Sequence, residues 1–303
     1  MKAMQAAATE QGFALVIVLW VLALLSSLAA SLAFSMRTET TLAYDLAAQA
    51  QARALAEAGV YRGILELINP DRLRRWRGDG SRHRIRFGGA PITVSVQDEA
   101  GKIDLNSAQR ELLDTLLRAS GVEDERRDAL LDAIEDWRDA DNLRRLNGAE
   151  DQEYEAAGRT YGAKDATFNT VEELQQVLGV TPRLFRRLRP ALTVHSHSAG
   201  IDDRLAPPAV LRALLLSNQD PDGDLEEVLA RRRDDAAESG KNQRDAPTPI
   251  IDARFVVPSN GVIYTVRAEA RLPPQTRASI AATIKLVHRS GKPYTVLTWQ
   301  ESD

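Results

Sequence analysis

The sequence predicts an α+β fold in which one long N-terminal helix supports an antiparallel sheet, and a large helical segment interrupts that sheet in sequence. Three observations predict it. An uncharged apolar run near the N-terminus continues directly into a stretch of good helix formers. Polar and apolar residues alternate over residues 84–97, and this alternation returns only after residue 250. Between these regions, residues 104–233 show the 3.6-residue periodicity of amphipathic helices.

The apolar run extends from Phe13 to Phe34 and contains no charge and no proline. At about 1.5 Å of rise per residue, a helix of this length crosses the roughly 30 Å hydrocarbon core of a bilayer. The residues that follow favour a helix, and Asn69-Pro70 is the first firm stop. We therefore expect one continuous helix from about Phe13 to Ile68, with its first half in the membrane. A cleaved secretory signal, a plain membrane anchor and a buried core helix are the alternatives.

Strand patterns occur on both sides of the helical segment. Residues 84–87 and 92–97 flank Gly88-Gly89, which predicts a hairpin. Residues 234–249 are polar and resemble a linker. Further strands of an antiparallel meander are then expected at 250–256, 262–272, 279–288 and 294–300.

Capping signals divide residues 104–233 into helices. Asn106 or Ser107 can cap a helix that ends near Ala119, and a second helix is expected over 123–138. Thr170 with Glu173 has the spacing of a capping box. Further helix starts are expected at Thr181-Pro182, at Pro207-Pro208 and at Asp224 with Glu227.

The segment from Asn106 to Leu112 is echoed, one residue shorter, by the segment from Asn169 to Leu174. The echo resembles helix-hairpin-helix modules, whose glycine-containing turns present backbone amides to DNA phosphates. Acidic residues follow the glycine turn of the first segment, at Gly121. The glycine turn of the second segment lies near the basic residues Arg183, Arg186, Arg187 and Arg189. We interpret the echo as a packing unit and keep DNA binding as the alternative.

Carboxylates are concentrated in residues 136–151. Asp139, Asp141, Glu150 and Asp151 bracket a loop that can fold back on itself. Ca²⁺ takes about six to eight oxygen ligands and is usually held on such a loop, although the spacing here is not that of an EF-hand. On spacing alone, a calcium site and a solvated acidic helix end are equally good interpretations.

Composition argues against an enzyme. The chain has 303 residues, a net charge of −4 and no cysteine, which excludes a thiolate metal site and gives no general attraction to nucleic acid. No Gly-x-Ser-x-Gly motif is present. His195 and His197 fit a surface pair better than a zinc site. We expect no catalytic activity.

A short polar leader that ends in Gly12-Phe13 and runs directly into the apolar helix resembles the prepilin-type signal of pilins and type II secretion pseudopilins. In that family, prepilin peptidase cuts after the glycine, and the new N-terminal residue, here Phe13, is methylated. The signal departs from the usual pattern at Gln11, where a basic residue is common, and at Ile17, where most pilins carry glutamate. The large minor pseudopilins of the protein K family characteristically lack that glutamate.

Two further segments are similar to the protein K family: the tract of residues 19–25, and the acidic stretch from Asp136 to Asn142 followed by Asn147 to Asp151. The resemblance implies a pilin-like fold with a large helical insertion. It also implies a structural Ca²⁺ bound in the acidic region, for which the candidate ligands are Asp139, Asp141, Glu150 and Asp151.

The resemblance further implies a single-pass protein of the inner membrane, with its C-terminal bulk in the periplasm. Such a protein would form the tip of the pseudopilus with other minor pseudopilins, contact the major pseudopilin and support export across the outer membrane. The alternative is a membrane-anchored helix-hairpin-helix protein that binds DNA. The expected domains are a leader (1–12), a transmembrane helix (13–35), the first part of a pilin-like domain (36–103), an inserted helical domain (104–233), a linker (234–249) and the remaining strands (250–303).

Overall fold

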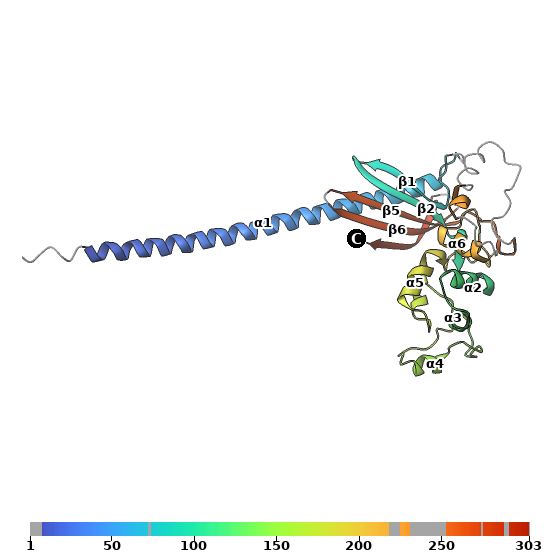
Figure 1. Ribbon diagram of the computed structural model, residues 1–303. Coiled ribbons are helices and arrows are strands. Elements are labelled where there is room, and N and C mark those ends of the chain that lie inside the picture. Colours follow the sequence, from blue (N-terminus) through green and yellow to red (C-terminus); the bar gives the residue numbers. More distant parts are fainter. Residues whose placement is uncertain are drawn as a thin grey trace, which may run out of the picture.

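The computed structural model describes residues 8–71, 74–217, 225–230, 253–273, 275–287 and 291–302. It contains a long helix, a five-stranded sheet that packs on the C-terminal part of that helix, and a block of short helices beside the sheet (Figure 1). The predicted α+β class is confirmed.

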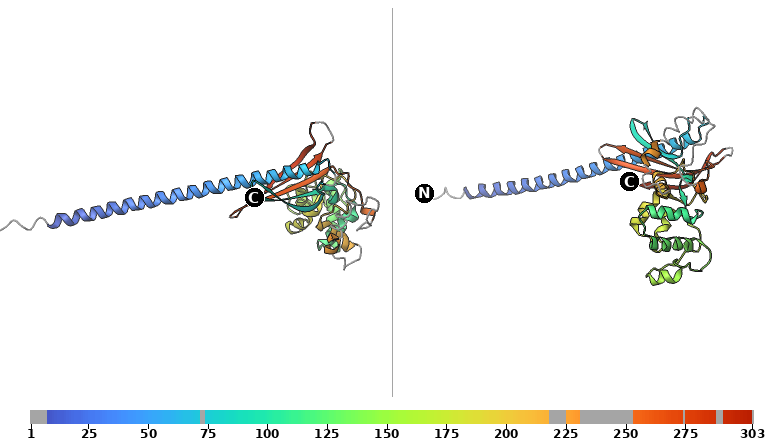
Figure 2. Two further views of the ribbon diagram at one scale, coloured as in Figure 1. Left: turned by 90° about the horizontal axis from the view of Figure 1, so that it is seen from above. Right: turned by 45° about the vertical axis from the view of Figure 1, so that its right-hand side comes forward.

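Helix α1 extends over Ala8–Leu67, 60 residues without a break. It ends one residue before the predicted stop at Ile68. The stretch Phe13–Leu67 contains an 18-residue window with a mean hydropathy of 2.6, and none of that window is buried within the protein. The N-terminal half of α1 projects freely from the rest of the molecule in all three views (Figures 1 and 2). A helix of this length and composition can cross a membrane.

The sheet has the strand order β1-β2-β5-β6-β7, and every neighbouring pair is antiparallel. The predicted hairpin is confirmed, and the strands that follow the helical block complete the same sheet because β5 pairs with β2. The strands are β1 (Asp79–Phe87), β2 (Ala90–Asp98), β5 (Ile263–Leu272), β6 (Thr276–Leu286) and β7 (Tyr294–Ser302).

The C-terminal part of α1 packs on one face of this sheet, and its buried residues begin at Ala52. Two glycines permit the close approach. A Cβ atom at Gly59 would lie 2.7 Å from the Ala268 Cβ, and one at Gly63 would lie 2.5 Å from the Val266 Cγ1. Side chains at these positions would push α1 away from β5, so the sequence places glycine where helix and strand meet.

The helical block has its own hydrophobic core, separate from the core between α1 and the sheet. A short 3-10 helix, η1 (Glu99–Gly101), leads into it from β2. Two short strands, β3 (Ile103–Asp104) and β4 (Leu192–Thr193), pair in parallel at its base. Its helices are α2 (Arg110–Ala119), α3 (Asp124–Arg138), α4 (Asp151–Ala156), η2 (Val171–Gln175), α5 (Pro182–Leu188), η3 (Arg189–Ala191) and α6 (Pro208–Ser217).

The capping predictions are confirmed in part. Thr181 caps α5, and its hydroxyl accepts a hydrogen bond from the Leu184 N–H at 3.2 Å. Neither Asn106 nor Ser107 caps α2, because the Asp104 carboxylate accepts hydrogen bonds from both of their N–H groups and holds them in a turn before the helix.

The expected capping box at Thr170 is wrong in detail. Thr170 makes no side-chain cap to η2, while Glu173 accepts a hydrogen bond from the Asn169 N–H at 3.1 Å. The second carboxylate oxygen of Glu173 accepts from Lys164 instead of from the cap residue. The partnership with Lys164, which lies nine residues earlier, has no local sequence signal.

The strand expected at 250–256 is also wrong where the structure describes it. Residues Ala253–Phe255 form a 3-10 turn, η4, and Val256 makes only an isolated bridge to Ile201. Phe255 is buried in the core of the helical block, which draws this segment away from the sheet. The predicted linker at 234–249, residues 250–252 and the cap at Asp224 lie outside the described residues.

Candidate metal centre

The acidic segment connects the end of α3 to the start of α4, at the part of the helical block farthest from the sheet (Figure 1). The amphipathic pattern of α3 turns Leu130, Ile134 and Trp137 into the core of the block. Asp136 also lies on the inward side and is fully buried. The chain then leaves the helix at Asp139 and returns at Glu150, the residue that precedes α4.

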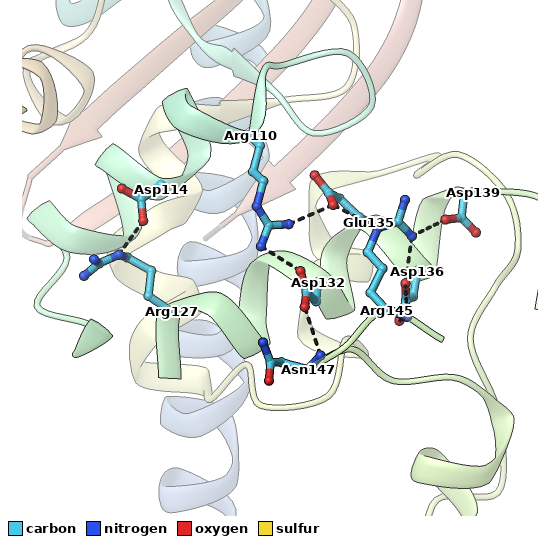
Figure 3. A network of polar contacts seen from close by, with 9 residues as sticks. All are labelled: Arg110, Asp114, Arg127, Asp132, Glu135, Asp136, Asp139, Arg145 and Asn147. Atoms are coloured by element: carbon cyan, nitrogen blue, oxygen red, sulfur yellow. Dashed lines mark hydrogen bonds and ion pairs between the residues drawn. The ribbon is translucent and has the colours of Figure 1, made fainter. Parts of the chain in front are cut away.

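Arg145 projects back from this loop into the carboxylates of α3 (Figure 3). Its guanidinium contacts Glu135 at 3.0 Å and Asp136 at 2.8 Å, and it also pairs with Asp139. A buried carboxylate without a partner is strongly unfavourable, so Arg145 supplies the charge that allows Asp136 to be fully buried. The carboxylates in turn raise the pKa of Arg145 and keep it charged, although burial alone would lower it.

A second arginine, Arg110, joins α2 to the same group of carboxylates. It binds Asp132 at 2.6 Å and Glu135 at 2.8 Å, so that Glu135 is shared between Arg110 and Arg145. Asp132 also accepts a hydrogen bond from the Asn147 N–H at 3.0 Å. Figure 3 shows these contacts as one network that fixes the loop to α2 and α3.

The opposite side of the loop has uncompensated negative charge. Both side-chain oxygens of Glu150 are buried and have no hydrogen-bond partner among the described residues, and the same is true of one oxygen each of Asp139 and Asp165. Burial, followed by repulsion from Asp136 and the neighbouring carboxylates, raises the pKa of Glu150 to about 7. Burial and repulsion from Asp151 also raise the pKa of Asp165. Anionic oxygens are therefore concentrated here, and apart from the Asp139 oxygen that pairs with Arg145 they have no cationic partner among the described residues.

The remaining two predicted ligands lie at the edge of this group. Asp141 is exposed and accepts a hydrogen bond from the Leu143 N–H at 3.0 Å. Asp151, the first residue of α4, is exposed and points toward the chain at Gly162, where a Cβ would lie 1.6 Å from its Oδ1. That close approach brings the turn bearing Asp165 next to the acidic loop.

These residues fit a hard cation by their chemistry. The free oxygens are carboxylates, the type of ligand that Ca²⁺ prefers, and a cation would remove both the repulsion and the desolvation cost. Within the described part of the chain, however, no three acidic or histidine side chains already form a ligand group. Of the candidate ligands, Glu150 has two buried oxygens without a partner and Asp139 has one, since its other oxygen pairs with Arg145. Asp141 and Asp151 would have to turn inward.

Asp165 is the residue that sequence analysis missed. It lies in the Ala163-Lys164-Asp165-Ala166 segment, which has no acidic neighbours in sequence and no spacing typical of a metal loop. Its backbone has a φ of 52°, an uncommon conformation for a residue other than glycine. Only the folding of residues 158–165 against α4 brings Asp165 to the acidic loop.

The glycine turns of the two echoed segments use their nearby arginines for packing. Gly121 and Gly179 both have positive φ, as such turns require. Arg187 donates a hydrogen bond to the Ser120 carbonyl at 2.9 Å, and Arg126 donates one to the Gly179 carbonyl at 3.0 Å. These arginines therefore join the two units to each other.

The predicted processing residues, Gly12 and Phe13, both lie within α1, and the Phe13 side chain is exposed. The Ile17 side chain, on the same apolar half of the helix, is also exposed. This half of α1 therefore presents only uncharged side chains to its surroundings, from Phe13 to Met36.

Comparisons with known proteins agree on one family. The family profile described as "Type II secretion system (T2SS), protein K" matches residues 94–197, the segment that contains the acidic loop. The chain is 29% identical over 240 residues to type II secretion system protein K of Pectobacterium carotovorum subsp. carotovorum, covering 69% of this chain and 71% of the relative. It is 29% identical over 206 residues to the protein K of Klebsiella pneumoniae, covering 60% of this chain and 61% of the relative.

The fold is similar to a chain in the crystal structure of the GspK-GspI-GspJ complex from the enterotoxigenic Escherichia coli type 2 secretion system. The TM-score is 0.57 at 19% identity, and the match covers 88% of this chain and 99% of that chain. Profile, relatives and fold therefore agree with the resemblance seen in the leader and in the acidic segment. In profile, relatives and fold, the chain is similar to the type II secretion system protein K family.

Proposed function

We propose that this chain is the minor pseudopilin that forms the tip of the periplasmic pseudopilus and supports protein export across the outer membrane. Similarity to the protein K family supports a structural role in secretion rather than catalysis. The similar structure is a complex with GspI and GspJ, which supports other minor pseudopilins as partners of this chain. The major pseudopilin below the tip is the further expected partner.

One observation carries the tip position. The helical block lies at the end of the molecule remote from the apolar half of α1 and projects sideways from the helix axis (Figures 1 and 2). In a filament built by parallel packing of such helices, subunits above this one would have to share that space. A subunit at the tip has no neighbour above it, so its block can overhang.

Ile17 also supports the placement of this subunit at the tip. In shaft subunits of the pilin type, a carboxylate near the equivalent of residue 17 pairs with the terminal amine of a neighbour within an apolar bundle. An unpaired carboxylate there is costly. The exposed apolar side chain of Ile17 avoids that cost in a subunit that has no neighbouring amine to bind.

Cross-linking of single cysteines tests the tip position, because the natural chain has no cysteine. Leu65→Cys introduces one on the exposed side of α1, and Asp128→Cys introduces one on the exposed surface of α3. We expect Leu65→Cys to cross-link to other minor pseudopilins, with about one copy in each filament, and Asp128→Cys to form no cross-link to the major pseudopilin. Cross-links spread along purified filaments, with several copies in each, would contradict the tip position.

We also propose that the inner membrane anchors α1 with the sheet and the helical block in the periplasm, and that prepilin peptidase removes residues 1–12. The glycine at position 12 leaves the peptide bond before Phe13 accessible at the start of the apolar run. The intact mass of the membrane-extracted protein should correspond to a chain that begins with methylated Phe13. Retention of Met1, or a different new N-terminus, would be evidence against this assignment.

Ca²⁺ is proposed as a structural cofactor of the acidic loop. Glu150 and Asp139 provide buried oxygens without partners, Asp165 adds another, and Asp141 and Asp151 lie close enough in the chain to complete the set. The ion would neutralise the group and fix the loop between α3 and α4. The protein side chains would hold the ion and exclude water from its inner face.

DNA binding is the alternative function, and the contacts at the glycine turns argue against it. Arg187 and Arg126 are engaged with turn carbonyls, and Arg189 pairs with Glu172. A gel-shift experiment with duplex DNA at moderate salt separates the two functions, since a pseudopilin should give no shift there. A salt-resistant shift that disappears when Arg183 and Arg186 are replaced by glutamine would favour DNA binding.

A further inference from the structure

A cleft of about 470 Å³ separates the helical block from the face of the sheet that α1 does not cover. Its floor includes residues from all five strands of the sheet. Its wall includes residues of η2, η3 and β4 and the two prolines that precede and begin α6. The cleft is distinct from the acidic loop, since none of the proposed calcium ligands lines it.

One cross-strand row runs across the floor. The strand pairing places Arg82 opposite Ser95, Ser95 opposite Arg267, Arg267 opposite Ala281, and Ala281 opposite Gln300. With neighbouring strands about 4.8 Å apart, this row spans roughly 19 Å. The small side chains of Ser95 and Ala281 alternate with long ones, which gives the floor its depth.

A second row runs parallel to the first, two residues along each strand, and carries hydroxyl and amide groups. It consists of Gln97, Thr265, Thr283 and Thr298. The Thr265 hydroxyl donates to Glu99 at 2.7 Å and lies 2.8 Å from the Thr283 hydroxyl, which therefore donates to it. The row keeps hydroxyl lone pairs that can accept hydrogen bonds from a ligand. The cleft floor is therefore polar along its full length.

The cleft is positively charged although the chain as a whole carries −4. Its lining contains four cationic side chains against two carboxylates. Lys102 pairs with Glu99 at 2.7 Å, and Arg189 pairs with Glu172 at 3.0 Å. The two cations left over are Arg82 and Arg267, neither of which has a hydrogen bond or ion pair to another described residue.

Arg267 lies in an unfavourable environment for a cation. Burial in the cleft, followed by repulsion from Arg189, lowers its pKa. An arginine held beside a second arginine, with no carboxylate of its own, is stabilised by an anion that enters from outside. Arg82, about 10 Å away across two strand spacings, offers a second position for such an anion.

We propose that this cleft binds an extended acidic segment of a partner protein, whose carboxylates pair with Arg267 and Arg82. Six extended residues cover about 20 Å, which matches the row across the floor. The hydroxyl and amide row then faces the main chain of the segment. This inference is independent of the tip position, because it rests on the cleft alone.

The composition of the wall favours a peptide over a single phosphate. Phosphate sites commonly use backbone N–H groups at a helix N-terminus. Here the α-helix start in the wall is Pro207-Pro208, which has no N–H to donate, and the start of η2 carries the carboxylate of Glu172, which repels a phosphate. A small anion would also occupy only one end of a row that crosses five strands.

The test uses the full chain in a neutral detergent and a fluorescent hexaglutamate peptide, with binding measured by anisotropy. We expect saturable binding that weakens as salt is raised. Arg267→Gln should raise Kd at least about tenfold, or roughly 1.4 kcal/mol, and the Arg82→Gln/Arg267→Gln pair should abolish binding. Because the Arg82 and Arg267 side chains make no hydrogen bond or ion pair to another described residue, these variants lose no such contact and are expected to melt at or above the temperature of the natural chain.

Arg271→Gln is the matched control. Arg271 lies on the same strand and the same face, but outside the cleft, where it pairs with Glu269. The Kd of the Arg271→Gln variant for the peptide should remain within about twofold of that of the natural chain, a difference of less than about 0.5 kcal/mol. Equal losses in Arg267→Gln and Arg271→Gln would show binding to general positive charge and would overturn the proposal. So would competition by inorganic phosphate or citrate at the same concentrations as the unlabelled hexaglutamate.

Discussion

The side chain of Asn106 forms a pair of hydrogen bonds with the backbone of Phe168. Its amide nitrogen donates to the Phe168 carbonyl at 2.9 Å, and its amide oxygen accepts from the Phe168 N–H at 2.7 Å. Asn106 begins the first echoed segment, and Phe168 directly precedes the second. The pairing therefore joins the two units at their equivalent ends, and Phe168 itself is buried in the core of the block.

Asn106→Ala should destabilise the helical block. Both backbone groups of Phe168 would lose their partners, and an unsatisfied buried polar group costs about 1–3 kcal/mol. Denaturant unfolding of the full chain in detergent measures the loss. Asn169→Ala is the control, since Asn169 is exposed and its side chain makes no described hydrogen bond, and its effect should remain within about 0.5 kcal/mol. Equal effects of the two substitutions would refute this role for Asn106.

Calcium should raise the melting temperature of the natural chain, and a chelator should lower it again. A ligand that binds only the folded state adds about 2.7 kcal/mol at a hundredfold excess over its Kd.

The melting temperature of Glu150→Gln should differ from that of the natural chain in both conditions. In chelator the variant should melt at or above the natural chain, because the neutral amide removes a buried charge that its neighbours repel, whereas the response to calcium should be lost.

Glu155→Gln is the control for that experiment, because Glu155 is exposed on α4 beyond the acidic loop. Its calcium response should equal that of the natural chain. A melting curve of the natural chain that is the same in calcium and in chelator would rule out the cofactor. A calcium response that persists in Glu150→Gln would move the site away from this loop.

Arg145→Gln should destabilise the chain by about 1–3 kcal/mol, because the fully buried Asp136 would retain only weak hydrogen bonds from the Arg145 N–H, at 3.3 Å and 3.4 Å. Arg144→Gln is matched in sequence but removes only an exposed pair with Glu153, which is worth about 0–1 kcal/mol. Thermal melting in chelator compares the two. Equal stabilities would show that Asp136 does not depend on the guanidinium.

Glu99 should make the chain sensitive to acid. Burial alone would raise its pKa, but Lys102 and hydrogen bonds, including one from Thr265 at 2.7 Å, outweigh burial and hold the pKa below the ordinary value of 4.5. A lowered pKa in the folded state contributes stability that is present above pH 4.5 and is lost as the pH falls through the folded value.

Unfolding of the natural chain and of Glu99→Gln across this range checks the linkage. The natural chain should be the more stable at neutral pH, and the difference should shrink below pH 4.5. Glu111→Gln, on the exposed side of α2, should show no such convergence. A difference between the natural chain and Glu99→Gln that does not change with pH would contradict the assignment.

The parts of the fold that sequence predicted well are those set by local pattern. The end of α1 follows from Asn69-Pro70, the β1–β2 hairpin from Gly88-Gly89, and the start of α5 from Thr181-Pro182, since each signal acts on its immediate neighbours. The strand expected at 250–256 failed because Phe255 is buried in the helical block, a preference that alternation of residues does not reveal.

In the candidate site too, sequence predicted what depends on local pattern and missed what depends on contacts between distant segments. Carboxylate density located the acidic loop, but the distribution of charge within it depends on partners from elsewhere in the chain. Arg145 neutralises Asp136, and Arg110 reaches across from α2 to Asp132, while Asp165 arrives from a later turn. None of these pairings has a short-range signature, so sequence identified the segment without identifying the complete set of side chains around it.

The split of the sheet has a consequence for the order of folding. Glu99 and Thr265, which hydrogen-bond next to the β2–β5 pairing, are 166 positions apart. During synthesis, the β1–β2 hairpin emerges first, and the edge of β2 remains unpaired until the entire helical block has followed. Long-range strand pairing is slow because the intervening loop must close. We expect a block that folds first on its own core to bring the ends of β2 and β5 together and so to shorten the loop that must close before the sheet can form.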